Sequence, residues 1–276
     1  MDSFLSIFAD DTKLFAEVGT EKQVREVQES VDAMQKWATT WKMKFNSSKC
    51  HVLHLGHNNK KNTYMLGGLK IEPSHHEKDV GVYVQDDLKF DLQCKKVSST
   101  CNRIIGQVWR SFTNKDPELM LKILKCYIFP HTDYCVSLWN PYLQKDIDMI
   151  ESIQRRFTRM ITGMKSLSYE DRLDRLGLCT LKERRRRIDL IETYKIWNNI
   201  DLVEGSMFRK VCDSHSLSTR NASKDNFVLN KSKLNHRKHF FSNRVIQDWN
   251  KLPVEVQRSS TLGMFKSKLS ALTLKS

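Results

Sequence analysis

The sequence predicts an α+β fold, in which a short segment of strands and one helix precedes a longer helical segment. Alternating or continuous apolar runs near residues 5–16, 50–55, 64–71 and 80–84 are typical of strands. Apolar residues at spacings of three and four dominate after residue 115, as in amphipathic helices. With 39% hydrophobic and 28% charged residues, the 276-residue chain can bury a sizeable core.

Positive charge increases along the chain and divides it into three segments. Residues 1–92, 93–206 and 207–276 carry net charges of −2, +6 and +10, within a total of +14. Such a gradient favours a polyanion as the partner, with nucleic acid the commonest class and an anionic membrane surface the lesser alternative. We therefore expect the last two segments to hold the polyanion.

The first ninety residues predict two hairpins, one helix and further antiparallel strands. Asp10 and Asp11 stand between two apolar runs and mark the tip of the first hairpin, with half-buried strands on either side. Thr20 and Gln23 form a capping box before a helix over 20–41. Strands are expected over 50–55 and 80–84, and Gly67-Gly68 supplies the turn of a hairpin over 64–71. The helix would pack on one small antiparallel sheet.

The next hundred residues predict a succession of helices with clear start and stop signals. Asp116 and Pro117 begin a helix that Pro130 is expected to end. A second helix is predicted over 145–162, with its apolar residues inward, Arg155, Arg156 and Arg159 on the other side and Gly163 at its end. Ser168 and Thr180, each followed three residues later by an acidic residue, predict the starts of two more helices.

Basic residues cluster in the helical part and near the C-terminus, and each cluster has two interpretations. Four consecutive arginines, Arg184, Arg185, Arg186 and Arg187, cover every side of one helical turn, so at least one must face the core. They either contact phosphates or cover apolar neighbours with their aliphatic stems. The candidates for nucleic-acid contact are Arg155, Arg156, Arg159, Arg184, Arg185, Arg186, Arg187, Arg237, Lys238 and Arg244. Phe157, Phe240, Phe241 and Trp249 could stack on bases, but we favour core positions for them.

Cysteine spacing argues against a disulfide framework or a zinc ribbon, because the seven cysteines form no C-x-x-C pair. Cys50-His51 and Cys212-x-x-His215 each lack a second ligand pair at a regular spacing. No transmembrane run and no signal peptide is visible. We therefore expect an intracellular protein, nuclear or cytoplasmic and not secreted, with no membrane partner.

The Asp10-Asp11 pair also has two interpretations. Aspartate side chains hydrogen-bond to nearby backbone in tight turns, so the pair could simply shape the hairpin. Alternatively, two adjacent carboxylates are ligands for a hard divalent cation, and Mg²⁺ commonly takes one or two carboxylates together with substrate phosphates. The sequence motif by itself leaves both open.

Seven stretches, in this order and spacing, resemble the C-terminal part of the reverse transcriptases of non-LTR (LINE-type, jockey-like) retrotransposons. The stretches are FADDTKLF, WKMKFNSSKCHVLHLG, KDVGVYVQDDLKF, YIFPHTDYCVSLWNPY, IESIQRRFTRMITG, SYEDRLDRLGLCTLKERRRRIDLIETYKIW and FSNRVIQDWNKLP. Together they span nearly the whole chain.

The resemblance implies a partial polymerase palm over 1–92, a mostly helical thumb-like domain over 93–206 and a basic C-terminal extension over 207–276. It implies that Asp10 and Asp11 are catalytic and bind Mg²⁺, or Mn²⁺ in its place. Phe8 corresponds to an aromatic position that is Tyr in many relatives, and Lys49 to a lysine near the primer end and the triphosphate. Phe8 and Lys49 are thereby candidate substrate-binding residues, although Lys49 could equally be a solvated lysine before a strand.

The resemblance also implies that a third carboxylate and the fingers lie upstream of this chain in a complete polymerase. The implied partners are an RNA template and an RNA/DNA duplex, with dNTP in the full-length parent. The first hypothesis is a fragment of an RNA-directed DNA polymerase, inactive by itself. The second is a non-catalytic, basic nucleic-acid-binding protein derived from such an element.

Overall fold

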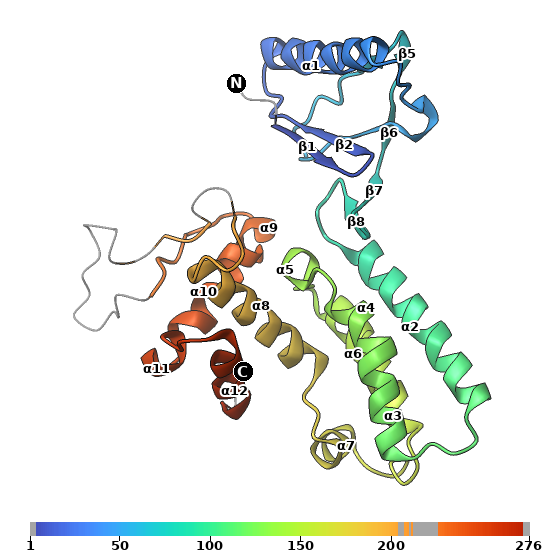
Figure 1. The fold of residues 1–276 in the computed structure, drawn as a ribbon, viewed down its shortest axis with the longest axis vertical. Helices are drawn as coiled ribbons and strands as arrows, with labels where there is room; N and C mark the ends of the chain where they lie inside the picture. Colours follow the sequence, from blue (N-terminus) through green and yellow to red (C-terminus); the bar gives the residue numbers. More distant parts are fainter. Residues whose placement is uncertain (1–3, 204–206, 210, 212–225, 273–276) are drawn as a thin grey trace. The chain divides into compact units, whose positions relative to one another are not determined.

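The computed structural model describes residues 4–203, 207–209, 211 and 226–272, which fall into two compact units (Figure 1). Unit 1 comprises residues 1–89 and holds all eight strands of the described residues. Unit 2 comprises residues 90–276 and is helical. The predicted α+β class is thus confirmed, and each unit is described separately below.

Unit 1 begins with the predicted hairpin, formed by β1 (Phe4–Phe8) and β2 (Asp11–Phe15). Phe8 pairs with Asp11, so Ala9 and Asp10 make a two-residue turn. Ala9 has a φ of +52°, and a positive φ at this position is a feature of the primed hairpin turns. The expectation of half-buried strands is wrong, because the pair forms a sheet of its own in which Phe4, Ile7 and Phe8 are 56 to 65% exposed.

Helix α1 (Glu21–Thr40) begins at the predicted capping box. The Thr20 side chain accepts a hydrogen bond from the Gln23 backbone, and the Gln23 side chain accepts one from the Thr20 backbone. Further along the helix, the Gln28 amide pairs with the backbone of Met65, donating at 2.8 Å and accepting at 2.9 Å. The Gln28 side chain therefore makes the two backbone hydrogen bonds that a neighbouring strand would otherwise make with Met65.

The remaining strands of unit 1 do not form the single antiparallel sheet that was expected. They are β3 (His51–Leu53), β4 (Met65–Leu66), β5 (Leu69–Lys70), β6 (Glu72–Ser74), β7 (His76–Asp79) and β8 (Val82–Gln85), arranged in two-stranded sheets. The β4–β5 hairpin turns at Gly67 and Gly68, both at positive φ, as predicted. However, β3 and β6 run parallel, which the long connection between them allows because it contains that hairpin.

The strand expected over 80–84 begins two residues later than predicted. Val80 and Gly81, at φ +42° and +86°, form the turn between β7 and β8. A β-branched residue such as valine rarely adopts the left-handed region, because it is strained there. The valines therefore predicted a strand at a position that the structure uses for a turn.

Unit 2 begins with a long helix that the sequence analysis did not define, α2 (Asp91–Ser111). It is followed by α3 (Pro117–Ile123), which Asp116 caps as predicted through the backbone N–H of Leu119. The prediction that Pro130 ends this helix is wrong. A π-helical turn, η2 (Leu124–Ile128), leads into α4 (Phe129–Asp133), whose second residue is Pro130. Proline is tolerated there because the first N–H groups of a helix have no intrahelical partner.

The following helices are α5 (Val136–Trp139), α6 (Gln144–Arg159), α7 (Tyr169–Leu176) and α8 (Leu181–Trp197). Ser168 and Thr180 cap α7 and α8 as predicted, each accepting from the backbone N–H three residues on. Helix α6 ends at Arg159, before the predicted end, and Gly163 at φ +78° lies in the turn beyond it.

The C-terminal segment contributes α9 (Asn235–Lys238), α10 (Phe241–Asn250), α11 (Val254–Gln257) and α12 (Leu262–Ala271). Its buried side chains share one core with Leu190 and Tyr194 of α8. In Figure 1, α10 and α12 lie beside α8. Phe157, Phe241 and Trp249 are buried, as favoured from the sequence, whereas Phe240 is 37% exposed.

Candidate nucleic-acid and metal sites

The Asp10-Asp11 pair lies at the exposed tip of the first hairpin. Asp10 occupies the turn and Asp11 begins β2, and both residues are exposed together with Phe8. Among the described residues no three His, Cys, Asp or Glu side chains gather to hold a metal ion. Within the described part of the chain, the two carboxylates thus stand without a third metal ligand. Cys212 and His215 lie outside the described residues.

Lys49 ends the short 3₁₀ helix η1 (Ser47–Lys49), and its side chain is exposed. Asn46 caps this turn by accepting from the Ser48 backbone at 3.2 Å. Neither a hydrogen bond nor an ion pair joins Lys49 to Asp10 or Asp11 in the part of the chain that the structure describes. The Asn46 cap accounts for the local fold of this stretch. It does not indicate what the Lys49 side chain binds.

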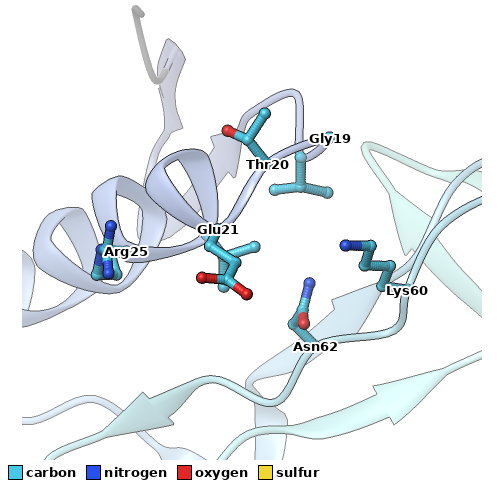
Figure 2. Close-up of a pocket in the computed structure, with 8 residues that line it drawn as sticks. Gly19, Thr20, Glu21, Arg25, Lys60 and Asn62 are labelled. Carbon is cyan, nitrogen blue, oxygen red and sulfur yellow. The ribbon is translucent and has the colours of Figure 1, made fainter.

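A separate hollow of about 240 Å³ lies at the N-terminus of α1 (Figure 2). Thr20, Glu21 and Arg25 line it from the helix side, and Lys60 and Asn62 line it from the connection after β3. Figure 2 shows the Glu21 carboxylate and the Lys60 amine both turned into the hollow, so its charges are mixed. No hairpin residue contributes to it, and this hollow is unrelated to the aspartate pair.

Arg155, Arg156 and Arg159, hereafter the α6 arginines, share the exposed side of α6. The opposite side buries Ile150, Ile153 and Phe157. Arg156 donates to Asn102 of α2 at 2.9 Å, and the Arg155 guanidinium lies 4.9 Å from the centre of the Tyr169 ring. None of the three pairs with a carboxylate of a described residue, so their charge is presented to solvent.

Arg184, Arg185, Arg186 and Arg187, hereafter the α8 arginines, bond mainly to other parts of the protein. Arg184 holds Asp133 with two donors, at 2.9 and 2.6 Å, and lies 3.9 Å from the centre of the Phe129 ring. Arg186 holds Asp248 in the same bidentate manner, which raises the pKa of Arg186. Arg187 donates to Glu183 at 3.1 Å.

Arg185 is the arginine of this run that faces the core, and it is 2% exposed. It donates to the Thr132 carbonyl at 2.8 Å and to Asn140 at 3.0 Å, and its guanidinium lies 3.8 Å from the centre of the Trp139 ring. Burial lowers the pKa of Arg185 to about 10. Its Nη2 atom has no hydrogen-bond partner among the described residues.

The three C-terminal candidates differ from one another. Arg244 holds Asp189 with two donors, at 2.9 and 2.8 Å, and also donates to the carbonyls of Val136 and Ser137. Arg237 and Lys238 of α9 are exposed, and the Arg237 guanidinium lies 5.6 Å from the centre of the Phe240 ring. Arg244 thus ties α10 to α5 and α8, whereas the other two face solvent.

Further exposed basic residues lie on α2, which the sequence analysis missed. Lys96, Arg103 and Arg110 recur every seven residues on the side opposite the buried Cys94, Cys101 and Ile105. Apolar residues at helical spacing from 94 to 108 carried the signal that could have revealed them. Helix α2 packs along α6, and Arg156 of α6 donates to Asn102 of α2. Both helices of this packed pair therefore carry exposed arginines.

No helix in the described ranges is both long enough and apolar enough to cross a lipid bilayer.

Comparison with known proteins shows a distant similarity. The chain is 25% identical over 141 residues to an RNA-directed DNA polymerase from the mobile element jockey of Drosophila funebris. The match covers 50% of this chain and only 15% of that polymerase. No family model and no solved structure matches. The comparison supports a distant relationship to non-LTR retrotransposon reverse transcriptases and leaves the finer assignments open.

Proposed function

We propose that this chain is part of a non-LTR retrotransposon reverse transcriptase and that unit 2 holds an RNA/DNA duplex by its phosphates. The distant jockey relative and the exposed arginines of α6 support the proposal. The alternative is a basic nucleic-acid-binding protein, derived from such an element, that has no catalytic role. Both functions share the same binding surface.

The observation that carries the proposal is the exposed side of α6. Three arginines stand there within five residues, and no described carboxylate neutralises them. Arg103 and Arg110 add exposed positive charge to α2, the helix that packs along α6. Arginines with unpaired charge release counterions when they meet phosphates, which gives affinity without reading sequence.

Arg184, Arg186, Arg187 and Arg244 have a different place in this proposal. Their donors are mostly engaged by Asp133, Asp248, Glu183 and Asp189, and a phosphate would have to displace those carboxylates. We therefore assign them to the packing of unit 2. Arg237 and Lys238, being exposed, remain secondary candidates for duplex contact.

Unit 1 would supply part of a polymerase metal site. In this proposal Asp10 and Asp11 bind Mg²⁺ or Mn²⁺, and Phe8 and Lys49 contact the substrate. Mg²⁺ completes its coordination with substrate phosphates and further carboxylates. Two metals clamp the attacking and leaving oxygens in such enzymes, so two carboxylates by themselves provide only part of the rate enhancement.

Duplex binding across a salt series tests the binding proposal. The triple variant Arg155→Gln, Arg156→Gln, Arg159→Gln should bind an RNA/DNA duplex more weakly and reduce the salt slope by about three units, roughly one per lost phosphate contact. The matched control removes the same charge from unit 1, through Lys22→Gln, Lys36→Gln and Lys44→Gln, which are all exposed. Equal slopes in the two triple variants would refute the assignment to α6.

Primer extension on poly(rA)·oligo(dT) with Mg²⁺ or Mn²⁺ separates the two functions. Extension that is lost in Asp10→Asn would place the chemistry in this chain. Salt-sensitive duplex binding without extension would favour the non-catalytic alternative.

A further inference from the structure

A cleft of about 370 Å³ opens between α6, α8 and α10 within unit 2. Pro141, Ile147, Ile150 and Val245 form its apolar walls. Its charged lining comprises five cationic and three anionic side chains, which are Lys182, Arg185, Arg186, Arg244, Lys251, Glu151, Asp189 and Asp248. The cleft therefore has a formal excess of two positive charges.

All three carboxylates of the lining are already engaged by the protein. Glu151 accepts from the backbone N–H groups of Leu181 and Lys182, at 3.1 Å each, and from the Tyr169 hydroxyl. Asp189 accepts from Arg244 and from Asn140, and Asp248 accepts from Arg186. Each carboxylate oxygen of the lining thus already accepts at least one hydrogen bond.

Donors remain unused on the cationic side of the cleft. Arg185 is 2% exposed, and its Nη2 atom is buried without a hydrogen-bond partner among the described residues. The amines of Lys182 and Lys251 likewise make no hydrogen bond or ion pair within those residues. A buried donor without a partner is costly, and a guanidinium binds best to a planar or tetrahedral oxyanion.

We propose that this cleft binds a small oxyanion of the phosphate class. Arg185, whose Nη2 atom lacks a partner among the described residues, lines the cleft, and Lys182 and Lys251 close on the ligand from the rim. The ligand is either a free phosphate or pyrophosphate, or a backbone phosphate of a nucleic acid.

Phosphate titration of the full chain tests the site. Thermal unfolding and calorimetry with sodium phosphate and sodium pyrophosphate are compared with sodium chloride at the same ionic strength. Saturable binding to the unmodified chain is expected. The double variant Lys182→Gln, Lys251→Gln should lower the affinity by about tenfold or more, since each lysine removes a charge-assisted contact.

Two further variants make the result specific. Lys266→Gln on α12 removes an exposed lysine outside the cleft and should leave phosphate affinity unchanged. Arg185→Lys keeps the buried charge but loses the second terminal donor, so affinity should fall while circular dichroism shows a folded chain. If Arg185→Lys does not fold, the lysine pair still decides the question, because both lysines are at the rim.

Competition with a short oligonucleotide distinguishes the two sources of phosphate. Displacement of bound phosphate would identify a nucleic-acid phosphate as the ligand, and simultaneous binding would identify a free anion. Stabilisation no greater than that by chloride, or affinity unchanged in the lysine double variant, would overturn the proposal. The test is independent of duplex binding to α6, which can fail while phosphate still binds here.

Discussion

Helices α6 and α8 are both rich in arginine, yet they use this residue in opposite ways. The α6 arginines stand on the exposed side of a helix that buries only its other side. Helix α8 packs against α5, α6, α10 and α12, so little of its surface is left for solvent. Its arginines consequently find partners inside the protein. The comparison shows that the number of arginines predicts neither a binding surface nor a core.

Arg185→Gln should have the largest effect of any arginine substitution on the two helices. The substitution removes the donors to Thr132 and Asn140 and the cation beside Trp139, and it leaves buried acceptors unpaired. We expect the free energy of unfolding to fall by about 3 kcal/mol, measured by urea denaturation. Arg159→Gln on α6 is the matched control and should change it by less than about 0.5 kcal/mol. Similar values for the two variants would contradict the contrast between the helices.

Glu151→Gln tests the contact through which α6 caps α8. The buried Glu151 carboxylate accepts two backbone N–H groups at the start of α8 and the hydroxyl of Tyr169. An amide has only one accepting oxygen, so at least one donor loses its partner. We expect unfolding to require about 2 kcal/mol less free energy by chemical denaturation. A neutral result would mean that Thr180 suffices to cap α8.

Asp146→Asn on α6 should stabilise the protein. This change tests the comparison in the opposite direction, because it removes a buried charge that has no partner instead of one that is paired. Asp146 of α6 is 1% exposed, and neither of its oxygens has a hydrogen-bond partner among the described residues. Burial raises the pKa of this carboxyl. We expect the variant to gain about 1 kcal/mol in free energy of unfolding at neutral pH, because an unpaired buried charge is removed.

The gain from Asp146→Asn should depend on pH. The folded state holds the Asp146 proton more tightly than the unfolded state, so protonation of Asp146 favours folding. This contribution to stability is complete below the pKa of the unfolded state. It is lost as the pH rises through the pKa of the folded state. The difference between variant and unmodified chain should therefore shrink as pH falls toward 3.8. Denaturation midpoints from pH 4 to 7, at fixed ionic strength, measure it, and a constant difference would refute the argument.

Arg187→Gln should have the smallest effect. Its partner is Glu183, one helical turn away, and both side chains are partly exposed, at 26 and 19%. Pairs of this kind on a helix contribute about 0.5 kcal/mol or less. Thermal unfolding at low and high salt should show a small shift that disappears at high salt. A shift as large as that of Arg185→Gln would contradict the small contribution expected of this partly exposed pair.

Local signals in the sequence were sufficient for several elements. The capping box at Thr20 and the Gly67-Gly68 turn needed only neighbouring residues, and the structure confirms them. The end at Pro130 was mispredicted, because the π-helical turn before it realigns the backbone and makes proline an early residue of α4. The parallel pairing of β3 and β6 was missed because the residues that pair are about twenty positions apart.

The sequence by itself determined the α+β class, the capped helix starts and the fact that some arginine of the run 184–187 must face inward. Only the tertiary structure decided which one does and what pairs with the others. The carboxylates of Asp133 and Asp248 lie 51 and 62 residues away from the arginines that hold them. Helical periodicity reports which side of a helix is apolar but contains no information about such distant partners. That separation is the physical reason why the sequence could not assign partners to the arginines of α8.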